Sequence, residues 1–184
     1  MNKHSEALWD LHSMVEQIDW DSVYTSELPR IYNFFLYKVG DREFAQDLTA
    51  TTFERAWKLR SKYRPAIAAI STWLFGIARN VLKEHLRKSR LSGQKLQDIT
   101  PLEEMPAKVD IEEMYQQQQE KVHLRKILLK LPDREQDLIA LKYGAGLTNR
   151  EIAQVTGLSE SNVGSILHRT VNKVRARLEN NDGR

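Results

Sequence analysis

Hydrogen-bonding and cationic side chains follow one side of a predicted helix over residues 159–178. Hydroxyl, amide, imidazole, guanidinium and ammonium groups of this kind bind the base edges and phosphate oxygens of duplex DNA. The other side of the segment is apolar at spacings of three and four residues, which predicts an amphipathic helix with a buried stripe. The candidate DNA-binding residues on the polar side are Ser161, Asn162, Ser165, His168, Arg169 and Lys173.

A second, shorter helix is predicted immediately before this one. Thr148 followed by Glu151 has the spacing of a capping box, so a helix should begin there. Gly157 is expected to end it, because glycine enters the left-handed region without steric cost, and Ser159 can cap the longer helix. A short helix, a tight turn and a longer helix with a polar, basic face predict a helix-turn-helix. The alternative is a helical hairpin whose polar side chains only contact water.

A helix predicted over residues 72–88 carries another candidate DNA surface. Asn80, Lys83 and Arg87 recur on one side of it, with Gly76 one turn earlier. Two cations beside an amide are suited to nucleic acid, because the cations can bind phosphates while the amide contacts a base edge.

The stretch before that helix, residues 61–71, is predicted to be a loop. Pro65 disfavours helical backbone at Arg64, and the short apolar run that follows lacks helical periodicity. Tyr63 and Trp73 flank the loop, and aromatic rings of this kind can stack on an unpaired base. A pocket for such a base and a loop that merely closes over the core are both consistent with the sequence.

A helix over residues 42–60 presents Asp47, Thr51, Glu54 and Lys58 opposite an apolar stripe. An ordinary amphipathic helix explains this pattern, and a docking face for a partner protein is the sharper alternative; periodicity fits both. Elsewhere, residues 1–20 are predicted to be helical and Pro29 to open a helix that ends at Val39. Asp133 with Gln136 is expected to cap a helix over residues 134–143.

Composition limits the classes of protein to consider. The 184 residues include only 8 glycines, 5 prolines and no cysteine, and no alternating apolar run has the length of a strand. An all-α protein without disulfides or thiolate metal sites is therefore expected, and a reducing cytoplasm fits it. The histidines have no ligand spacing and no catalytic motif occurs, so neither an enzyme nor a bound cofactor or metal is expected. No signal peptide or membrane span is apparent.

Charge divides the chain into three parts. Residues 81–95 contain five basic residues and one acidic residue. Residues 98–120 contain one basic and seven acidic residues, and residues 159–178 contain four basic residues and one acidic residue. Two basic regions around an acidic connector predict two nucleic-acid surfaces on one chain. We expect two small helical domains, residues 1–90 and 114–184, joined by a flexible acidic linker over residues 91–113, where prolines, a glycine and weak periodicity interrupt helix.

The whole pattern resembles a bacterial sigma factor of the extracytoplasmic-function group of the sigma-70 family. The similarity extends over residues 21–178, and no single piece decides it; the order and separation of the pieces do. The segments that carry it are DREFAQDLTATTFERAW (41–57), STWLFGIARNVLKEHLRKSR (71–90), LPDREQDLIALKYGAGLTNREIAQVTGL (131–158) and SESNVGSILHRTVNKVRARL (159–178).

The resemblance implies promoter-specific transcription initiation with core RNA polymerase. The first domain would bind the β′ clamp and melt the minus-ten element, and the helix-turn-helix domain would bind the minus-thirty-five element near the β flap. An anti-sigma factor is a further implied partner. The implied polymerase-binding residues are Asp47, Thr51, Glu54 and Arg55. The implied minus-ten residues are Tyr63, Arg64, Trp73, Asn80, Lys83 and Arg87, and the helix-turn-helix set above would bind the minus-thirty-five element.

Two departures from the family pattern bear on these implications. Ala50 and Thr51 stand where the family usually has glutamine and glutamate, which removes part of the expected clamp contact. The loop between Pro65 and Ile70 is more apolar than usual, which leaves the captured base undefined. A stand-alone helix-turn-helix regulator that binds operator DNA is the main alternative, and a helical adaptor that binds only proteins is another.

Overall fold

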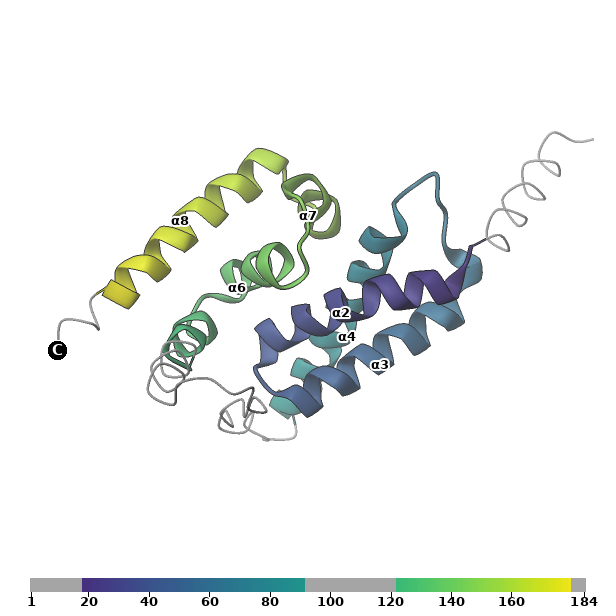
Figure 1. The fold of residues 1–184 in the computed structure, drawn as a ribbon, viewed down its shortest axis with the longest axis horizontal. Helices are drawn as coiled ribbons and strands as arrows, with labels where there is room; N and C mark the ends of the chain where they lie inside the picture. Colours follow the sequence, from purple (N-terminus) through teal and green to yellow (C-terminus); the bar gives the residue numbers. More distant parts are fainter. Residues whose placement is uncertain (1–17, 92–121, 180–184) are drawn as a thin grey trace, which may run out of the picture.

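The computed structural model describes residues 18–91 and 122–179, and all regular structure in these two ranges is helical (Figure 1). The all-α prediction is therefore confirmed. The predicted helix over residues 1–20, apart from its last three residues, and the acidic linker lie outside the described residues. The helices are α2 (Trp20–Val39), α3 (Arg42–Leu59), the 3-10 turn η1 (Arg60–Lys62), α4 (Ile70–Leu91), a helical segment at 122–129, α6 (Asp133–Ile139), the π-helix η2 (Ala140–Gly144), α7 (Asn149–Thr156) and α8 (Glu160–Glu179).

Helices α2, α3 and α4 form the N-terminal half, residues 18–91, and pack against one another around large buried side chains. Phe34 and Phe75 meet edge to face with ring centroids 5.8 Å apart, a geometry that aromatic rings prefer. Gly40 ends α2 with a φ of 74° and donates its N–H to Leu36, so the chain reverses into α3. This bundle fixes the orientation of the α3 and α4 outer faces.

The prediction that Pro29 opens a helix is wrong, because α2 begins at Trp20 and contains Pro29 in its interior. The carboxylate of Asp19 caps the start by accepting from the N–H groups of Asp21 and Ser22 at 3.1 and 3.2 Å. Trp20 also packs edge to face on Trp57, 6.1 Å between centroids. The cap and the aromatic contact hold the first turns, although proline removes one backbone hydrogen bond from the helix.

The C-terminal half, residues 122–179, departs from prediction where α6 begins. The N-cap is Pro132 with no side-chain hydrogen bond, and Asp133 is the first helical residue. Gln136 is buried, and its amide donates to the Leu128 carbonyl at 3.4 Å. The predicted Asp133–Gln136 cap is wrong because Gln136 instead satisfies the end of the preceding helical segment.

The helix expected over residues 134–143 is also not continuous. It is α-helical to Ile139 and then widens into η2, where the Ala145 N–H bonds to the Ala140 carbonyl at 2.9 Å. Gly146, with a φ of 69°, then redirects the chain, and Leu147 becomes buried. This turn sets the direction in which α7 and α8 leave the core.

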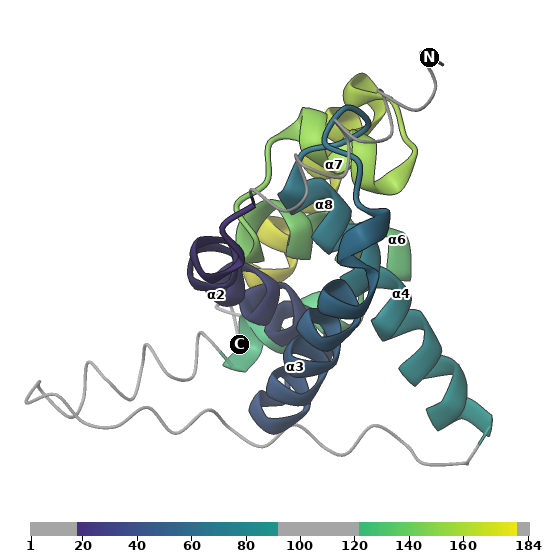
Figure 2. The same cartoon turned by 90° about the vertical axis from the view of Figure 1, so that its right-hand side faces the viewer.

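The two halves pack directly on each other, as Figures 1 and 2 show. Helix α2 contacts η2 and α6, and α4 contacts α7. The buried apolar residues of both halves form one continuous cluster, from Phe34 and Leu74 in the first to Leu138 and Ile152 in the second.

Candidate nucleic-acid interface

The helix-turn-helix is formed by α7 and α8, as predicted. The Thr148 N–H donates to the Glu151 carboxylate at 2.7 Å, and the Glu151 N–H donates to the Thr148 hydroxyl at 3.2 Å, which completes the capping box. Gly157 ends α7 with a φ of 76°, and the Ser159 hydroxyl accepts from the Asn162 N–H at 3.3 Å. Local sequence signals therefore fix both helix starts and the turn between them.

Helix α8 has one buried side and one exposed polar side. The buried residues are Val163, Ile166, Leu167, Thr170 and Val174. The structure brings five of the six candidate minus-thirty-five residues together on the exposed side, namely Ser161, Asn162, Ser165, His168 and Arg169. Small serine side chains at the start of the helix leave its N-terminal end slim enough to enter a major groove.

The sixth candidate, Lys173, is half-buried and already has a partner. Its ammonium group lies 3.2 Å from the Glu135 carboxylate of α6. These two side chains line a cavity of about 390 Å³ between α6 and α8, together with Arg134 and Arg169. Arg134 is an exposed cation that the sequence argument missed, because only the fold brings the start of α6 beside α8.

The α4 face is also assembled as expected. Asn80, Lys83 and Arg87 are exposed, while Leu74, Ala78 and Val81 on the opposite side are buried. A helical spacing of three and four residues aligns the amide and the two cations along about two turns. The face can therefore contact several consecutive phosphates and one base.

The loop before α4 places its aromatic residues differently from a simple base pocket. Tyr63 is only 5% exposed, and its hydroxyl donates to the Ala68 carbonyl at 3.0 Å. Its ring packs against Trp73, 5.2 Å between centroids, and burial raises the pKa of the Tyr63 hydroxyl. Arg64 donates to the Ser61 and Tyr63 carbonyls at 2.7 and 2.9 Å. In this conformation Tyr63 and Arg64, both predicted to bind DNA, stabilise the loop.

Trp57 and Ile67 are large exposed side chains beside this loop, and Arg60 next to them is half-buried. Trp57 is 53% exposed, and the Arg60 guanidinium lies 4.1 Å from its ring centroid. Ile67, at the tip of the loop, is 82% exposed. Trp57 is not among the site residues predicted from the sequence, although its three-residue spacing from Arg60 is a signal for a surface pair.

The candidate polymerase face of α3 is partly engaged within the chain. Asp47 and Glu54 are exposed and Thr51 is half-buried. Arg55 points to α4, where it forms an ion pair with Glu84 at 2.6 Å; that hydrogen bond lowers the pKa of Glu84 and raises the pKa of Arg55. The hydrogen bond from Lys58 likewise lowers the pKa of Glu54. Glu54 and Glu84 therefore bind protons less tightly than isolated carboxylates do.

Residues 18–91 and 122–179 contain no group of three potential metal ligands. None of their helices has the length and apolar character needed to cross a membrane. Two helical units with cationic, hydrogen-bonding faces, one of them a helix-turn-helix, define a DNA-binding protein.

Comparison with known protein families matches both units. The Sigma-70 region 2 family matches residues 23–91, and the Sigma-70 region 4 family matches residues 127–176. The ECF RNA polymerase sigma factor RpoE of Cereibacter sphaeroides is 32% identical over 149 residues, which cover 78% of each chain. The RNA polymerase sigma factor YlaC of Bacillus subtilis is 30% identical over 179 residues, 96% of this chain and 91% of that protein.

Solved structures show the same fold. The sigma factor RpoE in complex with the anti-sigma factor NepR from Bartonella quintana matches with a TM-score of 0.69 and 20% identity, over 88% of this chain and 97% of that one. CnrH in complex with the cytosolic domain of CnrY matches with a TM-score of 0.57 and 19% identity, over 95% and 94%. The chain belongs to the extracytoplasmic-function group of the sigma-70 family. It is a sigma factor, which partners RNA polymerase and directs promoter-specific transcription initiation.

Proposed function

We propose that the exposed side of α8 binds the minus-thirty-five element through its five clustered polar residues, with Lys173 and Arg134 beside the DNA backbone. The supporting observation is that these side chains lie on the N-terminal and central turns of the second helix of a helix-turn-helix, the part that contacts base edges in such motifs. Arg169 is the candidate for a base contact, because a guanidinium can bind guanine through two hydrogen bonds.

The α4 face and the preceding loop bind the minus-ten element in this proposal. Lys83 and Arg87 contact phosphates and Asn80 contacts a base. Tyr63, Arg64 and Trp73 hold the shape of the loop, while Trp57 with Arg60 provides the exposed aromatic surface for an unpaired base. Stacking of a base on such a ring contributes roughly 1–3 kcal/mol, which offsets part of the free energy needed to unpair that base.

The α3 face binds the polymerase clamp through Asp47, Thr51 and Glu54, and Arg55 positions Glu84 on the neighbouring helix. Since Arg55 is paired inside the chain, its contribution to polymerase binding is indirect. The C-terminal half binds near the β flap. The proposed domain limits remain residues 1–90 and 114–184, with the linker over 91–113 between them.

In this proposal the chain acts as a non-enzymatic regulator in the cytoplasm. Both structural neighbours named above are described as complexes with another protein, in one case an anti-sigma factor, and a partner of that kind is proposed for this chain as well. No residue of the described part is assigned to it.

Run-off transcription with core RNA polymerase over a promoter library tests the proposal. The expected result is initiation only when the chain and core enzyme are both present, with selected sequences at two elements on one side of the start site. Sequence-specific binding that is equally tight without polymerase would favour a stand-alone regulator. Absence of both initiation and DNA binding at low salt, where phosphate contacts are strongest, would favour a protein-only adaptor.

A further inference from the structure

The proposed DNA-binding face of α4 contains an acidic side chain, Glu84. It follows Asn80 by four residues and precedes Arg87 and Lys88 by three and four, so it begins on the same side of the helix as the groups proposed to contact DNA. It is the only acidic residue among residues 81–95, which contain five basic residues. A carboxylate at this position is unfavourable for DNA binding, because it repels phosphate and attracts the neighbouring cations.

In the structure Arg55 of α3 holds this carboxylate. Nη2 of Arg55 donates a hydrogen bond to Oε2 of Glu84 at 2.6 Å. That hydrogen bond is the largest cause of the lowered pKa of Glu84, and the charges of Lys88 and Arg87 lower the pKa further. Both members of the pair are partly exposed, and exposed ion pairs contribute little to stability. The main consequence of the pair is therefore where it holds the carboxylate.

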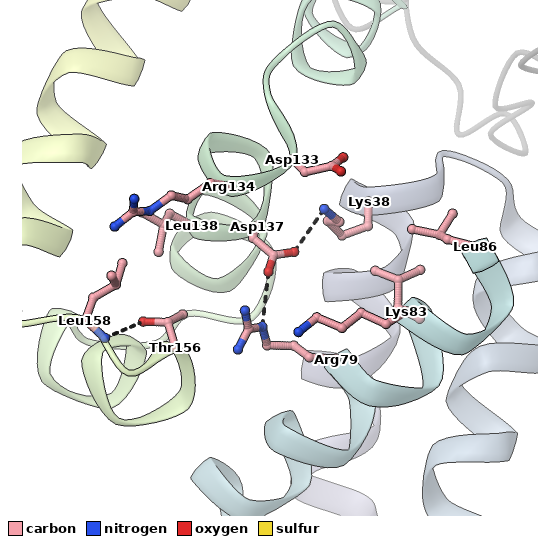
Figure 3. A pocket seen from close by; sticks show the side chains of 11 residues that line it. Lys38, Arg79, Lys83, Leu86, Asp133, Arg134, Asp137, Leu138, Thr156 and Leu158 are labelled. Carbon is pink, nitrogen blue, oxygen red and sulfur yellow. Dashed lines mark hydrogen bonds and ion pairs between the residues drawn. The ribbon is translucent and has the colours of Figure 1, made fainter. Parts of the chain in front are cut away.

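Arg87 and Lys88 are the cations that Glu84 would reach without Arg55. Both are exposed, and side chains three or four residues apart on a helix are neighbours. Glutamate four residues before lysine is the favourable order for such a pair. Lys83 instead extends into the cavity lined by α4 and α6 (Figure 3), on another side of the helix. A released carboxylate would thus neutralise one of the two cations that follow it.

We propose that Arg55 is a positioning residue of the minus-ten surface, because its ion pair with Glu84 keeps the carboxylate away from the two α4 cations that follow it. This inference rests on the proposed function of the α4 face. It gives Arg55 an effect on DNA binding, although the residue lies on α3 beside the proposed clamp contacts. It also makes Lys88, which is outside the predicted minus-ten set, a second phosphate contact next to Arg87.

Holoenzyme binding to a single-stranded minus-ten oligonucleotide, of the sequence selected in run-off transcription, tests this role of Arg55. Arg55→Ala frees Glu84 and should weaken binding roughly 3–10-fold at low salt, the share of about one phosphate contact. The slope of log affinity against log salt should become shallower by up to about 1. Arg55→Lys keeps a cation beside Glu84 and should retain most of the affinity. Unchanged binding by Arg55→Ala would overturn the proposal.

Removing the acidic group as well separates positioning from direct contact. Glu84→Gln should bind the oligonucleotide as tightly as wild type or more tightly, because α4 loses the carboxylate and keeps its cations. Arg55→Ala combined with Glu84→Gln should restore binding to the level of Glu84→Gln alone. If the double variant stays as weak as Arg55→Ala, Arg55 contacts DNA or polymerase itself and does not act through Glu84.

Arg175→Ala and Glu179→Gln are matched controls for net charge. Both residues are exposed near the end of α8, in the C-terminal half of the chain. They change the charge of the protein by the same amounts as Arg55→Ala and Glu84→Gln, so neither should alter binding to the minus-ten strand. Equal effects of the control and test variants would show that total charge sets the affinity, and the role of the ion pair would be refuted.

Arg87→Ala distinguishes failure of this inference from failure of the proposed function. If Arg87→Ala binds the strand as tightly as wild type, the α4 face is not the minus-ten surface and the proposed function fails. If Arg87→Ala weakens binding but Arg55→Ala does not, only the positioning role of Arg55 fails. Circular dichroism and titration with core polymerase check that each variant is folded and forms holoenzyme. A loss of core binding by Arg55→Ala that Glu84→Gln does not repair would assign Arg55 to the polymerase contact instead.

Discussion

The α8 face and the α4 region are both proposed to bind DNA, but they differ in how their side chains are held. On α8 the proposed DNA-binding side chains point away from the core, and their internal contacts are within the helix, such as Arg169 to the Ser165 carbonyl at 3.3 Å, or with α6 through Lys173. In the α4 region the proposed residues are divided between an exposed face and a loop held by the buried Tyr63 ring and the half-buried Trp73 ring. Stability and DNA binding should therefore be separable on α8 and coupled around the loop.

Substitutions at Tyr63 and Trp57 test the coupling between stability and DNA binding around the loop, and they have the largest effect that we expect. Tyr63→Ala removes a buried ring and its hydrogen bond to Ala68, so the free energy of unfolding should fall by about 3–5 kcal/mol. Trp57→Ala removes a half-exposed ring and should cost less stability but about 1–3 kcal/mol of single-strand affinity. Urea denaturation and binding to a minus-ten oligonucleotide by the polymerase holoenzyme measure the two quantities.

Tyr63→Phe is the matched control, since it keeps the ring and loses one hydrogen bond worth about 1 kcal/mol. If Tyr63→Ala weakened DNA binding while leaving stability unchanged, Tyr63 would be a direct DNA contact and the proposed division of roles would be wrong.

Arg169→Ala is expected to act on DNA alone. Arg169 is exposed and bonded only to its own helix, so thermal stability should remain unchanged while minus-thirty-five affinity falls by about 1–3 kcal/mol at one base pair. Holoenzyme binding to a set of single-base promoter variants measures the effect. Arg175→Ala, an exposed arginine of the same helix outside the proposed set, should leave the base preference intact. A loss spread evenly over all sequences would make Arg169 a phosphate contact.

Arg87→Ala should show the complementary behaviour on α4. A phosphate contact carries no sequence information, so affinity should fall uniformly for all promoters, and the slope of log affinity against log salt should become shallower by about 1. Holoenzyme titrations from low to high salt provide that slope. A change confined to one promoter position would instead assign a base contact to Arg87.

The same contrast explains what the sequence could predict. The capping box at Thr148, the turn at Gly157 and the exposed side of α8 depend on residues within one turn of each other, so spacing was sufficient. The burial of Tyr63 depends on Trp73, and that ring also contacts Trp20 in another helix. The inward turn of Gln136 and the partners of Arg55 and Lys173 likewise arise from tertiary packing. Local patterns contain no information about which distant group will meet a long polar side chain.

The interdomain surface provides the smallest predicted effect, through Glu27. Glu27 is buried beside Arg30, and burial raises its pKa against the opposing charge and hydrogen bonds of Arg30; the carboxylate of Glu151 across the interface raises it further. A raised pKa means that the folded protein binds this proton more tightly than the unfolded chain does. The stability that protonated Glu27 contributes is present below the ordinary glutamate pKa of 4.5 and is lost as pH rises through the raised pKa of the folded protein.

Glu27→Gln should therefore raise the free energy of unfolding, relative to wild type, more at pH 7 than at pH 4. Urea denaturation at the two pH values measures this difference.

Glu151→Gln is the opposite case. Burial raises the pKa of Glu151, but the hydrogen bonds from the Thr148 N–H and hydroxyl outweigh burial and lower the pKa on balance. The stability that ionised Glu151 contributes is present above the pKa of the unfolded chain and is lost as pH falls. Glu151→Gln should therefore lower the free energy of unfolding more at pH 7 than at pH 4. If the two variants changed the free energy of unfolding with the same pH dependence, Glu27 and Glu151 would have similar surroundings. The interface between them would then be open in solution.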